Sequence, residues 1–149
     1  MSMFSAFNIN ASGLTAQRYR MDVISENVAN ASTTRTADGT PYRRKVVAFQ
    51  EKGGRDTFQR VLGQATRGQD YTGAGVKVHG VYEDHVTEMN LVYDPSHPDA
   101  DENGYVEYPN VNIITEMTNM IDASRAYEAN STAFNASKAM VLKALELAQ

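Results

Sequence analysis

Residues 113–141, IITEMTNMIDASRAYEANSTAFNASKAMV, decide the fold, because they carry apolar side chains at intervals of seven. The members of this stripe are Ile113, Met120, Tyr127, Phe134 and Val141. A sustained seven-residue period is typical of a coiled coil, since 3.5 residues per turn keeps one stripe facing one partner. Neither proline nor glycine interrupts residues 111–149. The segment is therefore predicted to form one long helix over about 111–148.

The beginning of the chain, about residues 4–31, repeats this pattern with Phe7, Leu14, Met21 and Val28. At 1.5 Å per residue the two helices would measure roughly 40 and 55 Å. A compact chain of this size has a radius of gyration of about 15 Å. Two arrangements are open: an ordinary two-helix hairpin packed under a small sheet, or helices that complete their burial against other molecules. Each helix carries a narrow apolar stripe, or seam, rather than a broad core-facing face, and this favours the second arrangement.

The middle of the chain, residues 32–110, holds all four prolines and nine of the ten glycines. Its β-branched and aromatic runs predict strands at Arg43–Glu51, Gly75–Tyr82 and Met89–Tyr93. Asp56–Ala65 fits a short helix or a strand equally well. We therefore expect an α+β fold with three parts: an N-terminal helix (1–31), a small β-rich middle domain (32–110) and a C-terminal helix (111–149).

Composition excludes several classes of protein. The 149 residues carry a formal net charge of −4 and no cysteine, which argues against a general nucleic-acid binder, disulfides and thiolate metal sites. No apolar run approaches the ~20 residues that span a bilayer, so no membrane insertion is expected. The first eight residues lack the basic and apolar regions of an ordinary cleavable signal peptide.

Charge is segregated within the middle. Residues 35–67 hold eight basic and three acidic side chains, and residues 83–107 hold eight acidic ones with no Lys or Arg. The two stretches either face each other within one molecule or meet across a boundary between subunits, where they would set register and orientation.

The strongest metal-like motif is Asp99–Glu107, which matches the first half of an EF-hand loop. It fails at position 12, where Asn110 cannot supply a bidentate carboxylate, and Pro95 and Pro98 prevent an entering helix. We expect an Asn-Gly turn there, leading to the C-terminal helix, and no metal or cofactor. No G-x-S-x-G elbow or phosphate loop frames an active site, so no enzyme is expected. A calcium-dependent secreted binding module built on this motif is kept as an alternative.

Three short motifs resemble the signatures of the flagellar rod and hook protein family. The first runs over Ser25–Asn30 and contains Ser25, Asn27, Ala29 and Asn30, with threonines shortly after it. Arg125–Asn130 resembles the C-terminal signature of the whole family. The third resembles a proximal-rod branch of the family, and its residues are Tyr93, Asp94, Pro95, Pro98, Asn103 and Gly104.

The resemblance implies a structural subunit of the bacterial flagellar basal-body rod that transmits torque and catalyses nothing; a sibling rod subunit is the nearest alternative. Such proteins are exported unfolded through the flagellar type III apparatus without a cleaved signal and polymerise into a hollow axial structure in the periplasm. Their terminal helices form an inner coiled-coil layer. The implied partners are copies of the chain, other rod proteins, and basal-body ring and rod-adaptor proteins. The assembly interface would then consist of the two seams, namely Phe7, Leu14, Met21, Val28, Ile113, Met120, Tyr127, Phe134 and Val141.

Overall fold

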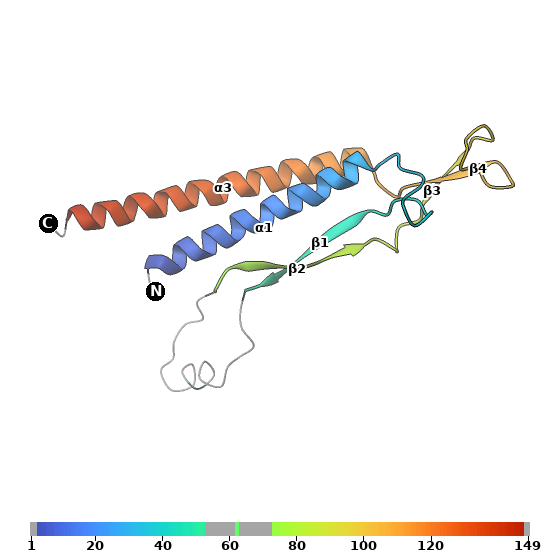
Figure 1. Cartoon of the computed structure of the whole chain (residues 1–149). Helices are drawn as coiled ribbons and strands as arrows, with labels where there is room; N and C mark the ends of the chain where they lie inside the picture. Colours follow the sequence, from blue (N-terminus) through green and yellow to red (C-terminus); the bar gives the residue numbers. More distant parts are fainter. Residues whose placement is uncertain (1–2, 53–61, 63–72, 148–149) are drawn as a thin grey trace.

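Two long helices lie side by side along most of the molecule (Figure 1). The computed structural model describes residues 3–52, 62 and 73–147. Helix α1 spans Met3–Ala29 and helix α3 spans Ile113–Glu146, and they run antiparallel with both chain ends at the same end of the pair. The helix predictions, and the α+β class as a whole, are confirmed. Neither helix combines the length and apolar character that a membrane span needs.

A twisted hairpin lies along α1. Strand β1 (Lys45–Glu51) pairs antiparallel with β2 (Val76–Glu83), with a register shift at Ala48/Phe49. Gly75, at φ +100°, lies just before β2 and against the helix, and the amide of Val76 donates to Ser12 Oγ at 3.1 Å. A Cβ on Gly75 would lie 2.2 Å from that oxygen, so only glycine permits this close approach.

A second hairpin stands at the far end of the helix pair (Figure 1). Strands β3 (Asn90–Tyr93) and β4 (Tyr105–Tyr108) form their own two-stranded sheet. All three predicted strands are present, within two residues of the expected bounds. The Asn-Gly turn leads to the last helix through β4, a strand that the sequence did not predict. The segment Asp56–Ala65 lies outside the described residues apart from Leu62.

The two helices pack on each other within one chain. The rings of Phe7 and Phe134 meet edge to face at 5.1 Å between centroids. Nearby, a Cβ on Gly13 would lie 2.8 Å from Asn130 Oδ1, so the absence of a side chain lets the helices approach closely. The hairpin arrangement is therefore present, and one side of α3 is left uncovered.

The buried apolar core is small and spread along this helix pair and its junction with the strands. Its members are Ala16, Val23, Ile24, Tyr42, Val106, Val111 and Ala123. Since two-stranded sheets are marginal by themselves, the helices supply the surface on which the β1–β2 hairpin rests.

Candidate functional site: the motif junction and the helix surfaces

Asn27, from the first motif, lies at the centre of a buried polar network at the end of α1. Its side chain is completely buried and makes four hydrogen bonds. Nδ2 donates to the carbonyl of Lys45 at 2.8 Å and to Glu116 Oε2 at 3.0 Å. Oδ1 accepts from the Tyr42 hydroxyl and from the Lys45 amide, both at 2.9 Å. One side chain thus ties α1 to β1 and to α3.

Glu116 and Arg44 form the charged part of this network. Glu116 is 1% exposed in the first turns of α3, and its Oε1 accepts from Arg44 Nε at 2.9 Å and Nη2 at 2.8 Å. Arg44 Nη1 also lies 3.7 Å from Asp84 Oδ2. Both Arg44 donors bond Oε1 and the Asn27 amide bonds Oε2, so each oxygen of this buried carboxylate has a hydrogen-bond donor. Glu116 was not among the predicted site residues.

Burial raises the pKa of Tyr42 to about 12, and the negative charges of Glu26, Glu116 and Glu83 act in the same direction. The hydroxyl therefore keeps its proton at neutral pH and stays a donor to Asn27.

Asn110 closes the junction on the strand side. Its Oδ1 accepts from the amide of Arg44 at 2.9 Å, and its Nδ2 donates to the carbonyls of Asp84 and Thr87 at 2.9 and 3.1 Å. Two residues later, Asn112 caps α3 by accepting from Ile114 and Thr115. The residue that fails as a calcium ligand is thus a structural amide.

The remaining residues of the first motif lie near the surface. Asn30 Nδ2 donates back to the Glu26 carbonyl at 2.9 Å, and its Oδ1 accepts from Thr33. Ser25 and Ala29 are exposed. Only two of the four motif residues therefore hold the turn after α1 in place.

The third motif shapes the loop between β3 and β4. Asp94 accepts from the amide and hydroxyl of Ser96, which lowers the pKa of its carboxyl. Gly104 adopts φ +80°, and a Cβ there would lie 3.0 Å from Tyr93 and 3.1 Å from Pro95. Three residues of the motif, Tyr93, Pro95 and Gly104, therefore lie close together in this loop conformation.

The two aspartates at the start of the EF-hand-like motif are engaged in the same region. Asp99 accepts from Thr34 at 2.9 Å and pairs with Arg35 at 3.5 Å. Asp101 accepts from the amides of Tyr105 and Asn103, the first of which contributes most to lowering its pKa. Within the described ranges no group of three or more acids and histidines is arranged to hold a metal.

Among the described residues, the basic and acidic stretches of the middle form two ion pairs inside one chain, Arg35 with Asp99 and Arg44 with Asp84. For these two pairs, the opposite charges therefore face each other within one molecule, as the first of the two alternatives expected.

The structure divides the predicted seam residues into two sets. Seven are half-buried, and they are Phe7, Leu14, Met21, Val28, Met120, Phe134 and Val141. Ile113 and Tyr127 are exposed. Further exposed apolar residues on α3, including Ile114 and Ile121, were not among the predicted seam residues. With Met117 they follow a spacing of three and four residues, which is a readable signal of a second helix stripe.

Comparisons with known proteins agree with this arrangement. Residues 7–35 match the family model described as "Flagella basal body rod protein", and residues 102–147 match "Flagellar basal body rod FlgEFG protein C-terminal". The helix pair and its end motifs thus define a flagellar basal-body rod protein.

Full-length relatives are more specific. The chain is 48% identical to the flagellar basal-body rod protein FlgC of Bacillus subtilis, with 99% of each chain covered. It is 48% identical to FlgC of Borreliella burgdorferi, over 100% of this chain and 99% of the relative. Identity to FlgC of Salmonella typhimurium is 43% over the full length of both. The chain belongs to the FlgC family.

Proposed function

We propose that this chain polymerises into the rod through its two terminal helices, residues 1–31 and 111–149, with the β-rich residues 32–110 outside that layer. As a member of the FlgC family it is a structural subunit of the flagellar basal-body rod. The helices would then form the coiled-coil-like inner layer of the hollow drive shaft, in its proximal part.

One observation carries this proposal: most of the large apolar side chains of α3 are exposed. Of its 34 residues, only Glu116 and Ala123 are buried. Ile114, Met117 and Ile121 are 77%, 58% and 52% exposed and follow one another along one side of the helix. Burial of apolar surface contributes about 25 cal/mol per Å², and contiguous exposed patches mark interaction sites. A neighbouring subunit is the natural cover for this stripe.

The nine seam residues take two roles in this proposal. The seven half-buried ones hold α1 against α3, as the Phe7–Phe134 contact does. Ile113 and Tyr127 face outward and join the exposed stripe as contacts between subunits. The helix pair, rather than a single helix, is then the unit of assembly.

We further infer that the chain acts in the periplasmic rod, reaches it through the flagellar type III export apparatus, and catalyses no reaction. Its partners would be copies of itself, other rod proteins, and the ring and rod-adaptor proteins of the basal body. The polar junction supports a purely structural role, because each oxygen and nitrogen of its central amide is already bonded within the chain.

Met117→Asp tests the proposal. An unpaired charge at a helix interface adds a desolvation penalty of several kcal/mol, so the variant should be absent from purified basal bodies and its cells non-motile. The soluble chain should keep its helical circular dichroism, because Met117 is exposed. Phe134 is a poorer choice, since it also contacts Phe7.

Thr115→Asp is the matched control. Thr115 is exposed two residues away, and the first turn of a helix accepts negative charge. Cells that carry Thr115→Asp should assemble normal rods and swim. Normally assembled rods that contain Met117→Asp would contradict the proposal.

A further inference from the structure

Strand β1 has a free edge that Asn27 covers only at its beginning. Asn27 bonds both the amide and the carbonyl of Lys45, as the peptide group of a neighbouring strand would. Lys45 is the register partner of Glu83, and its backbone groups point away from β2 toward this edge. Because backbone groups in an antiparallel pair alternate between the two sides of a strand, those of Val47 and Phe49 point to the same edge.

Val47 and Phe49 leave this edge open. Among the described residues, neither has a backbone hydrogen bond outside the β1–β2 ladder. Unpaired amides and carbonyls in a row are a template on which a further strand can form. The edge is therefore able to accept an extended segment through backbone hydrogen bonds.

A groove of about 280 Å³ lies beside this edge. Its lining comes from three elements: Val47 and Phe49 from β1, Arg20 and Ile24 from α1, and Asn119 from α3. A helix with its side chains is about 10–12 Å across, whereas an added strand lies only about 4.8 Å from the strand with which it pairs. The groove therefore suits an extended segment better than another helix.

Arg20 gives the groove a preference for negative charge. Its side chain is half-buried and has no anionic partner among the described residues. The two other cations that line the groove already have partners, since Arg44 pairs with Glu116 and Lys45 with Glu26. A guanidinium offers a fork of donors that matches a carboxylate. An acidic side chain on the added segment would therefore complete this site.

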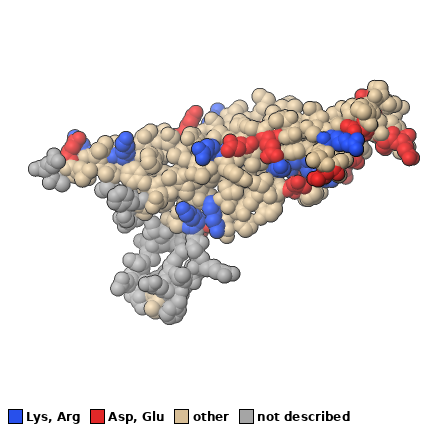
Figure 2. Space-filling view, in the orientation of Figure 1, with Lys and Arg blue, Asp and Glu red and all other residues tan. Residues whose placement is uncertain are grey.

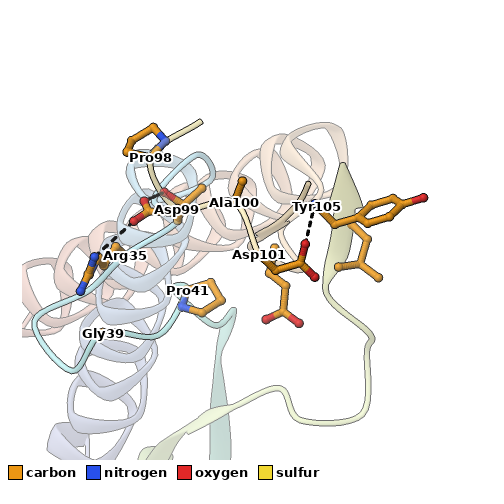
Figure 3. Close-up of a pocket in the computed structure, with 11 residues that line it drawn as sticks. Arg35, Gly39, Pro41, Pro98, Asp99, Ala100, Asp101 and Tyr105 are labelled. Atoms are coloured by element: carbon orange, nitrogen blue, oxygen red, sulfur yellow. Dashed lines mark hydrogen bonds and ion pairs between the residues drawn. The ribbon is translucent and has the colours of Figure 1, made fainter. Parts of the chain in front are cut away.

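The other charges of the chain give a partner less to select. In the cleft beside β3 and β4, Asp99 pairs with Arg35, and Asp101 accepts from the amide of Tyr105 (Figure 3). Figure 2 shows basic and acidic side chains interspersed along the face in view. Selection by charge therefore depends on a single unpaired group beside an open edge, as Arg20 is.

The described part of this chain does not supply the added segment. Its strands are already paired, β1 with β2 and β3 with β4. The exposed stretch between β2 and β3 is held in a turn, because Asp84 Oδ1 accepts from the amides of Val86 and Thr87. An extended segment that is free to pair with β1 is thus expected from another protein.

We propose that an extended segment of a different basal-body protein adds to the free edge of β1 and places a carboxylate on Arg20. The inference rests on the proposed function and gives the β-rich part of the chain a contact outside the helix layer. Alternate residues of a strand face the same side. The segment should therefore carry an acid for Arg20 and, two positions away, an aliphatic residue that lies against Ile24.

Cross-linking in motile cells tests the contact. Phe49 of the full chain is replaced by p-benzoylphenylalanine, and after irradiation the cross-linked peptides of purified basal bodies are identified by mass spectrometry. They should come from a different protein and contain an acidic and an aliphatic residue two positions apart. Tyr19 is the control position, because it is an exposed aromatic residue on α1 that does not line the groove. The label at position 19 should not yield this peptide.

Proline substitution tests the backbone bonds. Val47→Pro removes an amide that points to the free edge, so the β1–β2 ladder keeps its bonds, and proline is tolerated at such positions. Val81 is the register partner of Val47, and Val81→Pro removes the corresponding amide from the opposite edge. Val47→Pro should lower the cross-linking yield from position 49 about tenfold. Val81→Pro should leave the yield unchanged, and the two soluble chains should unfold at similar urea concentrations.

Charge reversal at Arg20 supplies an arm that leaves the backbone unchanged. Arg20→Glu should lower the yield about tenfold, because like charges then meet in the groove, and Arg20→Gln should lower it less. Arg18→Glu is the control, since Arg18 is exposed and does not line the groove.

Two results would overturn this inference: cross-links from position 49 to a second copy alone, or a yield that neither Arg20→Glu nor Val47→Pro changes. Absence of the unsubstituted chain from purified basal bodies would instead overturn the proposed function.

Discussion

Asn27 Nδ2 donates to Glu116 Oε2 at 3.0 Å and joins two residues that are 89 positions apart in the chain. Both side chains are buried where α1 ends and α3 begins. The contact also brings in β1, because Asn27 bonds both backbone groups of Lys45. The side-chain amide of Asn27 therefore holds α1, α3 and β1 together at one point.

Asn27→Leu is expected to destabilise the chain strongly. The substitution leaves Glu116, Tyr42 and the amide of Lys45 each short of a buried partner, and each such loss costs about 1–3 kcal/mol. We expect a loss of at least about 3 kcal/mol in urea unfolding of the soluble chain. Ser25→Ala is the control, because its exposed hydroxyl bonds only the Met21 carbonyl. Similar losses from the two variants would argue against the network.

The Arg44–Glu116 pair should show strong coupling in a double-mutant cycle. Removing one partner of a buried ion pair costs about 3–5 kcal/mol, because the other charge is left buried and unpaired. Arg44→Met and Glu116→Gln should each destabilise the chain, and the double variant should be more stable than the sum of the two losses indicates. Arg43, whose side chain has no anionic partner in the described part of the chain, is the control. Additive losses would show that the 2.8 Å contact contributes little.

Tyr42 should make stability fall in strongly alkaline solution. Its pKa is about 12 in the folded chain against 10.0 for the free group. Between these values the folded chain keeps a proton that the unfolded chain has lost, so stability decreases as pH rises. Tyr42→Phe should remove this part of the pH dependence, measured as the difference in unfolding free energy between the two chains from pH 9 to pH 12. An identical slope in both chains would contradict the assignment.

Gly104→Ala should cost more stability than Gly39→Ala, although both glycines have nearly the same backbone conformation, at φ +80° and +79°. A left-handed conformation costs a non-glycine residue roughly 1–2 kcal/mol at either position. Only at Gly104 would the added Cβ also press on Tyr93 and Pro95, while nothing lies within 4 Å of that position at Gly39. Thermal unfolding of the two variants measures this difference: Gly39→Ala reports the backbone strain alone, and Gly104→Ala reports the strain together with the contact with Tyr93 and Pro95. Equal losses would mean that the tyrosine and proline move aside.

The helices could be predicted from the sequence because their signal is local. A seven-residue period such as Phe7, Leu14 and Met21 reports helical geometry without knowledge of any partner. Strand β4 could not be predicted in this way, because its four residues depend on pairing with β3 and follow a turn that fits several structures. The local pattern indicates a turn equally well whether a strand or a helix comes next.

The site was only partly predictable for a related reason. Asn27 was singled out as a motif residue, but its partners come from three separate segments and no local pattern identifies them. Glu116 gave a weaker signal: it lies three residues after Ile113 and four before Met120, which places an acid on the apolar side of the helix. An acid in that position predicts a buried pair, and Arg44 is that partner.

Hydrogen exchange should be graded along α3 in the soluble chain. Both buried residues of the helix, Glu116 and Ala123, lie in its first third. Beyond the contact of Phe134 with Phe7, the last turns carry exposed Met140, Leu142 and Leu145. Backbone order costs about 1–2 kcal/mol per residue, and little burial offsets that cost in these turns. Amides near Ala123 should therefore exchange slowly and those after Met140 fast, as measured by mass spectrometry of peptides.

Incorporation into basal bodies should then slow exchange most after Met140, because a neighbouring helix covers surface that the isolated chain cannot bury. Residues near Ala123 provide the internal reference, since they are already protected. Uniform protection along α3 in a proven monomer would show that the last turns need no partner. Equal gains at both ends on assembly would show that the first turns of α3 are no better protected in the isolated chain than the last ones.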